Sequence, residues 1–134
     1  MSPEEAMARI NDLLAHAWMV RTFLKHADEI QENEEMLEVP RTLFDYCRAV
    51  EPSHARGDAS EYVRRAKGKL SKLRKVVEYY AANYRSVSDH TNYQMADVSL
   101  RTMFRDLEAT LASVVKDVGR SEPPESPGTA VPGL

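Results

Sequence analysis

The sequence predicts an all-α protein, and three observations carry that prediction. Apolar residues recur at three- and four-residue steps over long stretches, as in helices with one buried face. No stretch alternates polar and apolar residues as a half-buried strand does. Helix-starting patterns occur at Ser2 to Glu5, Asp58 to Glu61 and Thr91 to Gln94. Because short connections between long amphipathic helices favour antiparallel neighbours, we predict an antiparallel four-helix bundle with three long helices and one short helix.

The length and composition predict one domain followed by a tail. The chain has 134 residues, of which 43% are hydrophobic and 29% are charged, a balance typical of a single globular domain. Residues 1–118 carry the helical patterns and form the predicted bundle. Residues 119–134 contain 4 Pro and 3 Gly with almost no periodicity, so we expect a disordered tail there.

The first long helix is predicted to run from Pro3 to roughly Glu35. Ser2 is a suitable N-cap, Pro3 fits the first helical position and Glu5 can close a capping box. Trp18 and Met19 flank the apolar stripe of this helix, and such exposure can mark an interface. The stripe contains Ala6, Ile10, Leu13, Leu14, Ala17, Val20 and Leu24, and drifts onward through Phe23, Ala27 and Ile30.

The other three helices are delimited by prolines and capping patterns. Pro40 and Pro52 bound a short helix with an apolar face from Leu43 to Val50. A long helix starts at Asp58 and breaks within residues 86–90, whose side chains compete for backbone hydrogen bonds. The last helix, from Thr91 to Val118, has the clearest apolar face. That face contains Tyr93, Ala96, Leu100, Met103, Phe104, Leu107, Leu111, Val114 and Val118.

The charge pattern gives no whole-protein case for nucleic-acid binding, since the net charge is -3. A local basic cluster on the third helix could still contact phosphates. A solvated helix face is the favoured interpretation, because no aromatic residues for base stacking are interleaved with the cations. The six acids between residues 28 and 38 could balance the cluster within the fold or across a dimer. The cluster contains Arg64, Arg65, Lys67, Lys69, Lys72, Arg74 and Lys75.

The histidines and the cysteine indicate no metal site and no cofactor. No two of His16, His26, His54 and His90 have the spacing of a helical metal motif. His16 is expected to be partly buried and bonded to a neighbour. A single cysteine, Cys47, excludes an internal disulfide and multi-cysteine zinc motifs, and it is expected to be a buried structural residue.

One short pattern has a family resemblance. The segment from Arg85 to His90 has an arginine and a histidine separated by four residues, at the junction of the last two long helices. It resembles the R-x(4 to 6)-H signature of HEPN domains, which are helical bundles, often homodimers, and in many cases metal-independent ribonucleases. The resemblance implies that Arg85 stabilises phosphate and that His90 transfers a proton. The position after the arginine is Ser86, where the family often has asparagine.

The sequence favours a non-catalytic protein-interaction or assembly module, because no catalytic arrangement is more convincing than a structural explanation of the same residues. The expected partner is another protein or a second copy of the chain. RNA is a partner only under the HEPN-like alternative, in which Arg85 and His90 form the site. The absence of an apolar run of membrane-spanning length and of signal-peptide features predicts a cytoplasmic protein with no membrane partner.

Overall fold

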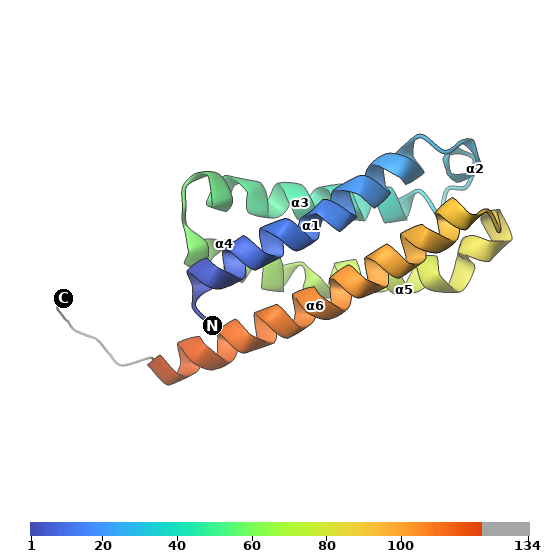
Figure 1. Cartoon of the computed structure of the whole chain (residues 1–134). Coiled ribbons are helices and arrows are strands. Elements are labelled where there is room, and N and C mark those ends of the chain that lie inside the picture. The colour runs from blue at the N-terminus through green and yellow to red at the C-terminus, as the bar shows by residue number, and fades with distance from the viewer. Residues whose placement is uncertain (122–134) are drawn as a thin grey trace.

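The computed structural model describes the backbone of residues 1–121 and the side chains of residues 1–114. Within these residues all regular structure is helical, which confirms the predicted all-α class. The part described contains six helices instead of the four predicted. They are α1 (Pro3–Lys25), α2 (Asp28–Gln31), α3 (Glu38–Ala55), α4 (Ala59–Gly68), α5 (Leu70–Val87) and α6 (Thr91–Ser121). Figure 1 shows α1 lying between α3 and α6.

The start of α1 follows the predicted capping box. The Glu5 N–H donates to Ser2 Oγ at 3.1 Å, and the Ser2 N–H donates to Glu5 Oε1 at 2.9 Å. Pro3 occupies the first turn, where its missing N–H leaves no hydrogen bond unmade. Sequence reasoning was therefore correct about both the position and the chemistry of this helix start.

The predicted end of the first helix at Glu35 is wrong, because α1 stops at Lys25. Ala27 is extended, and α2 follows as a single short turn. The chain then turns back, with the Met36 N–H donating to Asn33 Oδ1 at 3.0 Å. This path buries Ile30 and Met36 completely. Ten more residues of straight helix would have extended the chain by roughly 15 Å.

The prolines do not bound the second helix as predicted. Helix α3 begins at Glu38, two residues before Pro40, and continues through Pro52 to Ala55. Pro40 lies in the first turn, where backbone N–H groups have no helical partner in any case. Pro52 lies in the last turn, and the helix continuing past it buries Ser53.

The third predicted helix is divided in two at Lys69. Asp58 caps α4 as predicted, with its Oδ1 accepting the Glu61 N–H at 3.1 Å. Gly68 ends α4, and glycine is a weak helix former. The division lets the two segments pack against different neighbours. Helix α4 packs against α1 and α3, whereas α5 packs against α3 and α6.

The predicted break between the last two long helices is confirmed, but the cap differs. Helix α5 ends at Val87 and α6 starts at Thr91. The expected cap was Thr91, with Gln94 closing the box. Instead, His90 Nδ1 accepts the Asn92 N–H at 3.0 Å, and the His90 carbonyl accepts the N–H groups of Tyr93 and Gln94.

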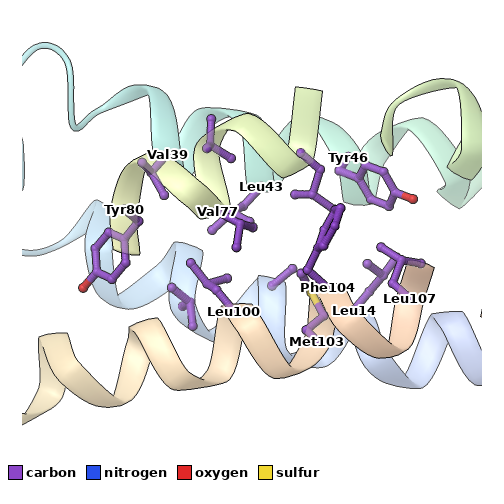
Figure 2. Close-up of a cluster of buried hydrophobic side chains, with 14 of the residues drawn as sticks. Leu14, Val39, Leu43, Tyr46, Val77, Tyr80, Leu100, Met103, Phe104 and Leu107 are labelled. Carbon is purple, nitrogen blue, oxygen red and sulfur yellow. The ribbon is translucent and has the colours of Figure 1, made fainter. Parts of the chain in front are cut away.

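The core contains the predicted face of α6. Leu100 and Leu107 are both fully buried, and Figure 2 shows them with Leu43, Val77 and Phe104 inside the helical layers. The remaining members of that face up to Val114 are also buried. The predicted end at Val118 and start of the tail at Gly119 differ from the α6 boundary at Ser121. Residues 122–134 of the predicted tail lie outside the described residues, as does the Val118 side chain.

Candidate interaction surface

The Arg85 and His90 side chains lie on opposite sides of the break between α5 and α6. Arg85 is in the last turn of α5, with its guanidinium carbon 4.9 Å from the centre of the Tyr84 ring. His90 precedes α6, and both residues are exposed. No hydrogen bond or ring contact joins the two among the described side chains. Because His90 Nδ1 accepts a backbone N–H, a neutral His90 carries its proton on Nε2.

A polar cluster surrounds the start of α6. The Tyr93 hydroxyl donates to Glu29 Oε1 at 2.9 Å, which connects α6 to α2. The pKa of Glu29 is lowered by its own backbone N–H, by this hydroxyl and by the nearby His90. Burial, together with the Glu29 carboxylate, raises the pKa of Tyr93 to about 12. The cluster therefore holds Tyr93 as a neutral donor and Glu29 as an anion at neutral pH, a structural arrangement of the two groups.

The other histidines also have local partners. His16 Nδ1 lies 2.7 Å from Ser99 Oγ, which joins α1 to α6, although His16 is exposed and not partly buried as predicted. His26 Nδ1 donates to the Thr22 carbonyl at 2.9 Å. Within the described residues, no three His, Cys, Asp or Glu side chains are grouped so that they could hold a metal ion.

The basic residues predicted on the third helix form a solvent-facing surface on α4 and α5, here called the basic face. All seven are exposed except Arg74, which is intermediate. Glu61 pairs with Arg64 at 2.7 Å and with Arg65 at 2.8 Å, and Arg74 pairs with Glu108 of α6. No ion pair within residues 1–114 joins the basic face to the acidic run at residues 28–38. That run lies where α5 meets α6, away from α4 (Figure 1).

Large exposed apolar side chains gather on α1 and α6. Trp18 is 43% exposed and Met19 69%, as the positions of both beside the apolar stripe predicted. Met95 is 52% exposed and Val98 42%, and sequence reasoning missed these two. Each lies alone on the outer side of α6, where single apolar residues are common, so the sequence carried no signal for them. Such side chains on a soluble protein mark a contact surface when they lie together.

The contacts between α1 and α6 place the two methionines at the same level. His16 meets Ser99, and Phe23 meets Tyr93 with ring centres 5.1 Å apart, so the two helices run in opposite directions. Met19 lies between His16 and Phe23, while Met95 lies between Tyr93 and Ser99. We define the apolar band as the exposed side chains of Ala15, Trp18, Met19, Met95 and Val98.

A groove of about 470 Å³ between α1 and α3 adjoins the apolar band. On one of its walls the Trp18 ring lies 6.0 Å from the Phe44 ring. The Arg21 guanidinium lies 4.8 Å from the Trp18 ring centre and 4.6 Å from that of Phe44, which fixes both rings by cation–π contacts. The groove is lined by Asn11, Leu14, Ala15, Trp18, Cys47, Arg48, Glu51 and His54.

Cys47 faces this groove and is half-buried, where full burial was predicted. Burial raises the pKa of its thiol to about 11, and Arg21 only partly offsets the effect. The thiol is therefore protonated at neutral pH and is a poor nucleophile. The groove has an apolar wall and a few polar groups, which suits a protein side chain as its occupant.

Comparisons of the chain with protein-family models, with curated proteins and with solved structures find no match. The residues themselves therefore carry the functional argument. In the part of the chain that the structure describes, no helix combines the length and the apolar character needed to cross a membrane.

Proposed function

We propose that this protein is a non-catalytic interaction module that binds another protein chain through the apolar band. The single observation that carries the proposal is that four large apolar residues are exposed on the adjacent helices α1 and α6. Among the described side chains, the exposed large hydrophobic residues are Trp18, Met19, Met95 and Val98. Burying such side chains yields roughly 25 cal/mol for each Å² removed from water.

The rigidity of the surroundings supports the proposal. Trp18 is held against Phe44 and Arg21, so a partner would meet a preorganised ring. Met19 is unbranched and adapts to irregular partner surfaces. Tryptophan anchors beside a groove are typical of the residues that dominate binding energy at protein interfaces. We propose the cytoplasm as the compartment in which this binding takes place.

Site-specific photo-crosslinking in cells tests this function. A photoreactive amino acid at Met19 should yield a covalent adduct with a protein. The matched control carries the same amino acid at Lys72, an exposed position on the basic face, and should yield none. Adducts at neither position, or equal adducts at both, would overturn the proposal.

A second candidate function is metal-independent RNA cleavage by Arg85 and His90. It is favoured by the helix break between them, because on a continuous helix five residues turn the second side chain about 140° from the first. Under this alternative Arg85 stabilises the phosphate and His90 transfers a proton through Nε2.

The test of this alternative is cleavage of single-stranded RNA in the presence of a chelator. A general acid or base is worth about 10² to 10⁴ in rate, so His90→Ala should lower cleavage by that factor if the alternative holds. Arg85→Ala should lower it similarly, and the double variant should fall well short of additive. Under the interaction-module proposal we expect no such cleavage.

A further inference from the structure

The outer face of α1 has an asymmetric charge pattern. Its beginning carries the exposed acid Glu4, and its end carries the exposed bases Lys25 and His26. The positions between them on this face are uncharged: Ala8, Asn11, Ala15, Met19 and Thr22. Asp12 is a second exposed acid beside Ala8, and Arg21 is engaged with the two rings on the α3 side. The face therefore has acids in its first half and bases at its end.

This pattern is self-complementary under a two-fold axis. We infer that the apolar band binds a second copy of this chain, with the two α1 helices antiparallel and Ala15 near the axis. That register sets Glu4 of each copy against His26 of the other, with Lys25 beside it, and Ala8 against Thr22. A parallel pairing would set like charges together. The inference rests on the proposed function and names its partner.

Side-chain sizes fit the same register. Ala15 and Ala8 are small, which lets two helix axes approach closely at the middle of the contact. The register sets the second copy's Met19 at the level of Asn11, on the side of α1 that carries Ala8 and Asp12. Met19 is 69% exposed and flexible, so its side chain can pack over Ala8 there.

Sedimentation velocity over roughly 1 to 300 µM full-length protein tests the partner, because small interfaces typically have micromolar affinity. Wild type should move from monomer towards dimer as concentration rises. Ala15→Glu places two carboxylates near the axis and should weaken dimerisation by at least tenfold. Ala82→Glu, the same change at an exposed position on α5, should dimerise as wild type does. A wild type that stays monomeric throughout overturns the inference.

A charge exchange tests the antiparallel orientation. Glu4→Lys and Lys25→Glu, each alone, should weaken the dimer roughly 3- to 30-fold, since each creates like-charge contacts at both symmetric ends. The double variant should regain most of the lost affinity. Failure of the double variant to recover, while each single variant still melts as a folded protein, overturns the antiparallel arrangement.

Disulfide trapping gives an independent measurement. In a Cys47→Ala background, Ala15→Cys should form a disulfide-linked dimer under mild oxidation, because a disulfide requires Cα atoms within about 7 Å. Ala82→Cys in the same background should not. Absence of the Ala15→Cys dimer, combined with photo-crosslinks from Met19 to a different protein, would refute the second-copy partner while leaving the proposed function intact. Absence of both would refute the two together.

Discussion

The apolar band and the basic face are both exposed helical surfaces, yet their compositions are opposite. The basic face carries a charge at most positions and satisfies several of them locally, as Glu61 does for Arg64 and Arg65. None of the residues that define the apolar band is charged. Solvent exposure alone explains the first surface, because charged residues opposite a core stripe are expected on any packed helix. It does not explain the second, which is why we assign binding to the apolar band.

The largest effect expected concerns the core that separates these two surfaces. Leu100→Ala and Leu107→Ala should each lower the free energy of unfolding by roughly 2 to 5 kcal/mol, because both side chains are fully buried. Denaturant unfolding monitored by circular dichroism measures this cost. A near-zero change in the free energy of unfolding at both positions would mean that a different face of α6 is buried. The assignment of the apolar band and the basic face as outer surfaces would then be wrong.

The thiol next to the apolar band should react slowly. Because burial raises the pKa of Cys47 from 9.0 to about 11, we expect alkylation at pH 8 to be roughly 10- to 100-fold slower than for an unfolded peptide cysteine. The raised pKa also means that the folded state holds the proton more tightly. Stability should therefore fall between about pH 9 and 11, less steeply in Cys47→Ala. A reaction rate equal to that of the free peptide would show that the groove leaves the thiol fully accessible and ionisable.

A smaller effect concerns Ser53 in α3. Its hydroxyl is fully buried and, among the described residues, has no hydrogen-bond partner. Ser53→Ala removes an unsatisfied polar group, so it should raise the free energy of unfolding by up to about 1 kcal/mol. Thermal unfolding measures the change, with Ser71→Ala at an exposed position of α5 as the control. A destabilised variant would indicate that the hydroxyl does make a hydrogen bond.

The smallest effect on stability is expected from the two surfaces themselves, and it distinguishes their roles. Charge reversal at Lys67, Lys72 and Lys75 should change the free energy of unfolding by about 0.5 kcal/mol or less for each residue. Met19→Glu should be equally mild for folding. Only Met19→Glu should abolish the photo-crosslinks formed from a neighbouring position in the apolar band. Loss of those crosslinks in the lysine variants would mean that the basic face takes part in binding.

The sequence correctly predicted the features that depend on residues close together in the chain. The Ser2 capping box, the Asp58 cap and the apolar face of α6 each involve neighbours within one or two turns, so spacing alone identifies them. The position of Trp18 and Met19 beside the stripe also indicated exposure. Met95 and Val98 were missed because single apolar residues on the outer side of a helix are common and carry no signal until a second helix is placed beside them.

The helix boundaries that were predicted wrongly are those that tertiary packing determines. The apolar drift from Phe23 to Ile30 predicted a continuing helix, but the chain turns after Lys25 to bury Ile30 and Met36. Pro40 and Pro52 predicted helix limits, yet both are tolerated near the ends of α3. The division at Lys69 has only the weak signal of Gly68. His90 could not be identified as a cap from its residue type, since histidine is not among the preferred N-cap residues.

Tyr93 has a consequence for the way this molecule opens. Its hydroxyl contacts Glu29 of α2, its carbonyl accepts the Tyr80 hydroxyl of α5 at 2.9 Å, and its ring meets Phe23 of α1. One residue thus ties three segments at the same end of the protein. We therefore expect the backbone amides of these segments to exchange with solvent in a single cooperative step. Their exchange rate should be lower than the rate expected if α2 frayed independently. Replacing Tyr93 with phenylalanine keeps the ring but releases α2, so exchange at Ile30 should become uncoupled from exchange at the start of α6.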